Sequence, residues 1–148
     1  MTRKAPLIIG MVVFLILSLA FVLMRRDASQ ERPFEHLLNC DIQNQACTQK
    51  LLDRDITLDI QPRPVKAMEN LLFKVKVSGP PLVKKPHIDL SMPGMDMGLN
   101  WAFLKPRSPG IYEGSGIIVK CPTGKTIWRA TVTLPEQGTV DFIFHVIY

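Results

Sequence analysis

Three methionines and a histidine stand close together in the middle of the chain. Met92, Met95 and Met97 fall within six positions, and His87 precedes the first of them by five residues. Thioether sulfur and imidazole are soft to borderline donors, and together they suit Cu(I) better than a harder ion. Pro93-Gly94 favours a turn that could direct the sulfurs into one small space. This pattern predicts a Cu(I) site with the three methionines as ligands and His87 as a further candidate.

The same methionines have an ordinary structural explanation, because flexible thioether side chains also fill gaps over a hydrophobic core. Spacing separates the candidates further. Met92 and His87 are an odd number of residues apart, so in a regular strand they face opposite sides. Met95 and Met97 are two residues apart and share a face. Methionines that cover the open end of a β-domain are therefore the alternative to a metal site.

No catalytic motif is recognisable in the chain. Gly-x-Ser-x-Gly, a Gly-rich phosphate loop, His-Glu-x-x-His and a cleft-like pair of carboxylates are all absent. The three histidines, His36, His87 and His145, are isolated from one another in sequence. His145 alternates with Phe144 and Val146, which is typical of a surface or edge histidine. We expect no enzyme, no catalytic residue and no organic cofactor.

A charge-free apolar run, residues 5–24, stands near the amino end of the sequence. Its length matches the roughly 20 residues that the hydrocarbon core of a bilayer requires. A cleavable signal peptide would carry a shorter apolar core and an Ala-x-Ala-like site, and no such site follows here. We therefore expect residues 1–26 to form one uncleaved transmembrane helix, with the larger carboxy-terminal part exported.

The formal net charge of +5 has its origin beside this apolar run. Four of the 18 basic residues flank the run, namely Arg3, Lys4, Arg25 and Arg26, whereas all 13 acidic residues lie from Asp27 onward. The remainder of the chain is thus close to neutral and lacks the electrostatic footprint of a nucleic-acid-binding protein. We expect a membrane as a partner and no nucleic acid.

The three cysteines, Cys40, Cys47 and Cys121, show neither zinc-knuckle nor thioredoxin-like spacing. In an oxidising compartment two of them would pair. The possible pairs are Cys40–Cys47, Cys40–Cys121 and Cys47–Cys121, and the sequence does not choose among them. Cys40–Cys47 is favoured because it requires only a local loop. We interpret the pair as a structural staple, and the remaining alternative is a thiol–disulfide partner that uses Cys121.

The hydrophobic period becomes two from Asp55 onward. Ile56, Leu58 and Ile60 alternate with polar residues, which is the pattern of a half-buried strand. Runs of this kind, separated by Pro and Gly turns, predict seven strands over residues 56–60, 71–77, 87–92, 100–104, 111–119, 126–134 and 139–148. Their spacing favours an antiparallel β-sandwich over residues 55–148. Residues 27–54 show no clear period, so we expect a linker and an irregular Cys-containing segment there.

From about Asp55 to Tyr148 the chain resembles the YtkA-like/FixH-like family of small membrane-anchored β-sandwich proteins. The matching features are the single anchor, the strand that ends in Ser91-Met92-Pro93-Gly94-Met95-Asp96-Met97-Gly98, the Gly110-Ile111-Tyr112-Glu113-Gly114 step and the later Gly124-Lys125-x-x-Trp128 strand. The resemblance implies a mainly β sandwich, immunoglobulin-like or copper-resistance-protein-like, that faces the bacterial periplasm and is anchored in the inner membrane by a single span. It also implies a role in copper handling or cytochrome oxidase assembly.

By motif position the resemblance carries over only the three turn methionines as metal ligands. The chain departs from the richest copper-binding members at Asp96, where a histidine would strengthen the site, and it has no Met/His tail.

Two hypotheses of different classes follow from the sequence. The first is a membrane-tethered accessory protein that captures Cu(I) at the methionine turn and exchanges it with a copper-transfer or oxidase-assembly partner. The second is a metal-free interaction module, whose exposed Met/Pro turn is an apolar contact for another membrane protein. Replacing the methionines by leucine separates the two, because leucine keeps the apolar surface and removes the sulfur.

Overall fold

The structure is a computed structural model, and it describes Leu15, Ser18 and residues 35–95 and 97–148. The chain divides into the units Met1–Glu35 and His36–Tyr148. The transmembrane helix predicted over residues 1–26 lies outside the described residues, apart from Leu15 and Ser18. Among the residues that are described, no helix has both the length and the apolar character needed to cross a membrane.

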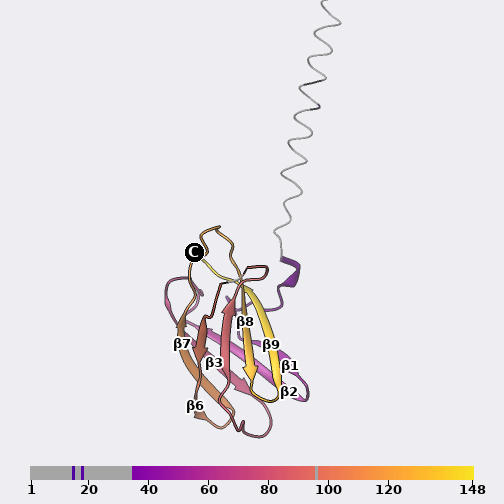
Figure 1. The fold of residues 1–148 in the computed structure, drawn as a ribbon, viewed down its shortest axis with the longest axis vertical. Coiled ribbons are helices and arrows are strands. Elements are labelled where there is room, and N and C mark those ends of the chain that lie inside the picture. The colour runs from indigo at the N-terminus through magenta and orange to yellow at the C-terminus, as the bar shows by residue number, and fades with distance from the viewer. Residues whose placement is uncertain (1–14, 16–17, 19–34, 96) are drawn as a thin grey trace, which may run out of the picture. The chain divides into compact units, whose positions relative to one another are not determined.

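The second unit is almost entirely β-structure (Figure 1). One turn of 3-10 helix, η1, covers Glu35–Leu37. The strands are β1 (Cys47–Leu51), β2 (Arg54–Gln61), β3 (Asn70–Val77), β4 (His87–Ser91), β5 (Trp101–Phe103), β6 (Lys105–Ser108), β7 (Ile111–Ile117), β8 (Ile127–Leu134) and β9 (Gly138–His145). They form two sheets in which neighbouring strands are antiparallel, with the orders β1-β2-β3-β7-β6 and β5-β4-β8-β9.

Strict alternation of side chains builds both sheets. In β3, Phe73 and Val75 are buried while Lys74 and Lys76 are exposed. In such a strand successive side chains point to opposite faces, so one face of each sheet is apolar and the other is solvated. The two apolar faces meet in one core, whose largest fully buried side chains include Phe73 from the first sheet and Trp128 from the second. The second unit is therefore a two-layer, sandwich-like β-domain.

The described residues hold nine strands rather than the seven predicted. The additional strand β1 lies inside the segment expected to be irregular, and it pairs with β2 from Cys47↔Leu58 to Leu51↔Arg54. The sandwich therefore begins before the predicted boundary at residue 55. The predicted strand over residues 100–104 ends at β5, and Leu104, which is buried, carries the chain across to β6 in the other sheet.

The disulfide joins Cys40 to Cys47, which confirms the pairing favoured from sequence. It fixes the segment that enters the domain against the edge of β9. Backbone N–H groups of Asn39 and Cys40 donate to the Ile143 carbonyl at 3.1 and 3.2 Å. The Asn39 side chain adds two hydrogen bonds to β9. Its Nδ2 donates to the Asp141 carbonyl, and its Oδ1 accepts from the Ile143 nitrogen at 2.8 Å. The edge of β9 is therefore covered by a disulfide-stapled segment rather than left open.

Several connections gather at one end of the sandwich, which we call the methionine end. It comprises residues 62–69, 92–100, 118–126 and 146–148. Lys66 bridges to Ile147, and the Met68 nitrogen donates to the Ile118 carbonyl at 2.8 Å, so the two sheets meet there. The connection after β4 reaches the same end because β4 is antiparallel to β8, whose first residue pairs with His145.

Candidate functional site

The methionine turn adopts a tight reversal directly after β4. The Met95 nitrogen donates to the Met92 carbonyl at 3.2 Å, and the two residues form an antiparallel bridge. Pro93 presets the first central position of the turn, and Gly94 takes the second with a φ of 70°. Directly opposed residues of an antiparallel pair extend their side chains to the same side. The turn thus places the Met92 and Met95 thioethers next to each other.

The three methionines differ in exposure. Met92 continues the inward face of Ile88 and Leu90 and is 1% exposed. Met95 and Met97 are half-buried and pack against the same core. The turn methionines therefore do cover the end of the core, as the structural alternative predicted. A thioether site at this turn would therefore be formed by one buried and two half-buried side chains.

His87 lies away from the methionines. It stands at the opposite end of β4 from Met92 and on the outer face, with its ring centroid 5.1 Å from that of Trp101. The odd spacing between His87 and Met92 had predicted these opposite faces, and a regular strand produces them. The structure opposes Met92 to Met95 across the turn and packs Met97 on the same core, and it places His87 at the far end of β4 on the other face.

Histidine, cysteine and carboxylate side chains of the described residues are further possible metal ligands. No group of three His, Cys, Asp or Glu side chains among these residues lies close enough to hold an ion. His145 has its Nδ1 3.3 Å from the Thr126 hydroxyl. It also lines a cleft of about 300 Å³ together with Leu38, Cys40, Asp41, Ile42 and Gln43.

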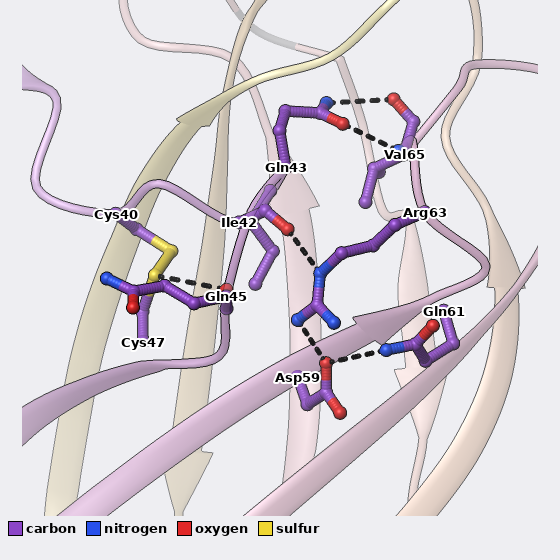
Figure 2. Close-up of polar contacts among 9 residues, drawn as sticks. All are labelled: Cys40, Ile42, Gln43, Gln45, Cys47, Asp59, Gln61, Arg63 and Val65. Atoms are coloured by element: carbon purple, nitrogen blue, oxygen red, sulfur yellow. Dashed lines mark hydrogen bonds and ion pairs between the residues drawn. A yellow bond between two sulfur atoms is a disulfide. The ribbon is translucent and has the colours of Figure 1, made fainter.

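Polar contacts beneath this cleft lock the entering segment to the β2–β3 connection (Figure 2). The Gln43 amide pairs with the backbone of Val65 as a strand would, donating to its carbonyl at 3.0 Å and accepting from its nitrogen at 2.7 Å. It donates to the His145 carbonyl as well, at 2.9 Å. Arg63 donates to the Ile42 carbonyl at 2.8 Å and pairs with Asp59. These groups satisfy one another, so the arrangement is a structural clasp.

Cys121 is the free cysteine of the described residues, and it is buried. Its sulfur lies 3.0 Å from the Thr123 hydroxyl. That hydrogen bond lowers the pKa of the Cys121 thiol, and burial opposes the shift. The nearby Lys125 charge adds a smaller lowering effect on the same pKa. The thiol is enclosed beside the turn at residues 121–124, where the Gly124 nitrogen donates to the Cys121 carbonyl at 3.0 Å.

Tyr148 holds that turn through its hydroxyl group. The hydroxyl accepts from the Cys121 nitrogen and from the Trp128 indole nitrogen, each at 3.2 Å, and donates to the Lys125 carbonyl. Sequence reasoning assigned Tyr148 only to the last strand. A terminal tyrosine following a core strand gives no local indication that its hydroxyl returns to a connection 23 or more residues earlier.

An exposed aromatic pair on β5 was also missed. Trp101 is 45% exposed and Phe103 is 67% exposed, and their rings meet edge to face at 5.8 Å. Leu99, just before the strand, is exposed as well. The alternation of Trp101 and Phe103 with the buried Ala102 could have indicated their position, because the two aromatic residues share one face of the strand.

Comparisons with known proteins add no relative: no family model, curated protein or solved structure matches this chain.

Proposed function

We propose that the chain is an exported, membrane-tethered protein of the bacterial inner membrane that binds Cu(I) through Met92, Met95 and Met97. The observation that supports this most directly is the turn itself. It opposes Met92 to Met95, and Met97 packs on the same core. Two or three thioethers suit Cu(I) and do not suit hard divalent ions. His87 is withdrawn from the proposed ligand set because it faces the other side of β4.

The proposed ligands fit the proposed compartment. Persistent disulfides are typical of oxidising, extracytoplasmic environments, and Cys40–Cys47 is such a bond. Thioethers keep their metal affinity where thiols are lost to disulfides. A site without thiolate or imidazole holds Cu(I) through neutral sulfur atoms only. We therefore expect exchangeable binding, which suits delivery to a copper-transfer or oxidase-assembly partner.

The strand order supports an immunoglobulin-like assignment of the sandwich. If β2 to β9 are named A, B, C, C′, D, E, F and G, the sheets read A-B-E-D and C′-C-F-G, with β1 added outside strand A. Constant-type immunoglobulin domains pair A-B-E-D with C-F-G. In such domains the loops cluster at the two ends of the sandwich, and the methionine turn is the C–C′ loop in this naming.

Titration with Cu(I) against a competing chelator tests the proposal in the full chain purified in detergent. The comparison variant carries Met92→Leu, Met95→Leu and Met97→Leu, which conserves apolar volume at a cost below about 1.5 kcal/mol for each exchange. Met68→Leu is the matched control, because Met68 is exposed and lies outside the turn. We expect one Cu(I) per chain in the parent and the control, and none in the triple variant. A parent that never competes with the chelator would overturn the proposal.

The second candidate is a metal-free interaction module, and the exposed Leu99, Trp101 and Phe103 favour it. Aromatic side chains are enriched at protein interfaces, and this group begins just beyond the methionine turn. A module of this kind would retain its partner in the methionine-to-leucine variant and lose it after Trp101→Ser with Phe103→Ser. A copper-delivering protein would instead lose its partner in the methionine-to-leucine variant and retain it after Trp101→Ser with Phe103→Ser.

A further inference from the structure

Exposed apolar side chains collect at the methionine end of the sandwich. Met68 is 67% exposed, Ile147 is 44% exposed, and Ile117 and Val119 are exposed to a similar extent. Hydrogen bonds bring their chain segments together, because the nitrogens of Ala67 and Met68 donate to the carbonyls of Ile147 and Ile118. Within the described part of the chain these side chains remain uncovered.

Lysines border this apolar group. The connections over residues 62–70 and 117–126 contain Lys66, Lys120 and Lys125 and one acidic residue, Glu69, whereas Arg63 in the first connection is paired with Asp59. Glu69 lies 3.9 Å from Lys66. The Lys120 ammonium stands 5.8 Å from the ring centroid of Tyr148, at the edge of the apolar group. Apolar side chains beside lysines are the composition of surfaces that bind anionic bilayers.

The chain enters the domain at this same end. Leu38 and His145 line one cleft, and Gln43 bonds to the His145 carbonyl. Figure 1 shows the indigo turn at residues 35–37 and the C-terminus at the end of the sandwich toward which β9 runs. The nine residues 27–35 that separate the predicted anchor from the domain span at most about 30 Å when fully extended. A tether of this length limits how far residue 36, at the entry end of the domain, can lie from the proposed anchor.

We propose that the methionine end rests on the anionic lipid surface of the membrane that holds the anchor. Met68, Ile117, Val119 and Ile147 enter the headgroup boundary, while the adjacent lysines face lipid phosphates. The inference rests on the anchor of the proposed function and deepens it. The methionine turn is then directed to the bilayer, so a copper donor or acceptor is a membrane-embedded protein that presents its site near the headgroups.

Bromolipid quenching in nanodiscs tests this orientation with the full chain. A fluorophore is attached at Val119→Cys on the methionine end or at Val83→Cys, a 94% exposed position between β3 and β4 at the other end. Both variants carry Cys121→Ser so that a single thiol reacts. We expect lipids brominated near the headgroup to quench the label at position 119 in anionic discs and to leave the label at position 83 unquenched.

Charge reversal supplies the matched electrostatic control. Lys66→Glu with Lys120→Glu should abolish the quenching at position 119 in anionic discs, and discs of zwitterionic lipid should reproduce that loss in the parent. Equal quenching of the labels at positions 119 and 83 would overturn the inference, and so would quenching at position 119 that the charge reversal does not change. A label at position 119 that remains exposed to water in discs, but is shielded from water in native membranes, would also overturn it, because a protein would then cover this surface.

The anchor and the orientation fail in distinguishable ways. Co-elution of the chain with the discs reports on the anchor, and the Cu(I) titration reports on the methionines. An aqueous label at position 119 on a disc-bound chain overturns the orientation alone, whereas a chain that does not co-elute overturns the anchor and the orientation together.

Discussion

Among single residues, Tyr148 connects more of the structure than its place at the end of the sequence indicates. Its hydroxyl forms hydrogen bonds with the indole nitrogen of Trp128, which is fully buried, and with the backbone of residues 121–125. An indole N–H inside a core requires an acceptor, since a buried donor without one loses its hydration and receives nothing in exchange.

Tyr148→Phe should lower the free energy of unfolding by about 1–3 kcal/mol, because it leaves the Trp128 indole N–H and the Cys121 N–H without their acceptor. Denaturant unfolding of the full chain in detergent measures the change. Tyr112→Phe is the control, since the Tyr112 hydroxyl makes no hydrogen bond with the described residues while its ring is buried. Equal losses in both variants would contradict the role assigned to Tyr148.

The exposure of single residues followed from sequence wherever a regular strand carried them. The period of two placed Met92 and His87 on opposite faces of β4, and the structure has Met92 buried and His87 on the outer face. The three hydrogen-bond partners of the Tyr148 hydroxyl did not follow, because each lies 20 or more residues before Tyr148 and no local pattern links them to it.

At the level of elements, two contacts determine how the sheets close at their margins. One is the disulfide-stapled segment on the edge of β9. The other is the approach of β5 to β7, where the Phe103 carbonyl oxygen would lie 2.3 Å from a Cβ atom on Gly114. Only glycine admits so close a backbone approach at that position.

Gly114→Ala should destabilise the domain by about 1–3 kcal/mol, because its methyl group would overlap a backbone oxygen that cannot rotate away. Gly116→Ala is the matched variant two residues along the same strand. Its methyl group would meet the Phe73 ring edge at 3.2 Å and the Ala102 methyl at 3.4 Å, which small side-chain movements relieve. Thermal unfolding should rank Gly114→Ala as the more destabilising change, and the reverse order would contradict the close approach.

Cys40→Ala with Cys47→Ala should lower the free energy of unfolding by about 2–3 kcal/mol, the chain-entropy estimate for a loop of this short length. The loop spans a sequence separation of 7 and delivers the fully buried Ile42 to the core. Unfolding with and without reductant measures the effect. The parent should weaken in reductant to the level of the variant, whereas the variant should not respond; a parent indifferent to reductant would contradict a structural role for the bond.

Elements with a continuous period of two were predicted close to their observed bounds, as β2, β3, β4, β8 and β9 show. β1 was not predicted, because its side chains Cys47 to Leu51 alternate without an apolar series and its pairing with β2 supplies the order. The division between β5 and β6 escaped for a similar reason. The chain changes sheet at Leu104 because of how the two layers pack, and the hydrophobic period of the sequence does not show this change.

For the whole molecule, the proposed copper site and the proposed membrane-facing surface share one end of the sandwich. A ligand that binds only the folded state stabilises it by mass action. Cu(I) bound at the methionine turn would then raise the free energy of unfolding of the whole domain.

Cu(I) at about one hundred times its dissociation constant should therefore stabilise the parent by about 2.7 kcal/mol. Thermal unfolding under anaerobic reducing conditions that leave the disulfide intact measures this effect. The Met68→Leu control should gain the same amount, and the variant with leucine at positions 92, 95 and 97 should gain nothing. Stabilisation of that variant equal to that of the parent would locate the copper elsewhere on the chain.

The position of the disulfide within the chain has a consequence for biogenesis. Cys40 and Cys47 precede β2, whereas Cys121 follows β7. If the chain is exported amino end first, as the proposed function implies, Cys40 and Cys47 reach an oxidising compartment before Cys121, and this order of emergence favours the native bond. By the time Cys121 appears, it has only to enter the closing core. The two pairings that involve Cys121 are then disfavoured by the order in which the cysteines emerge.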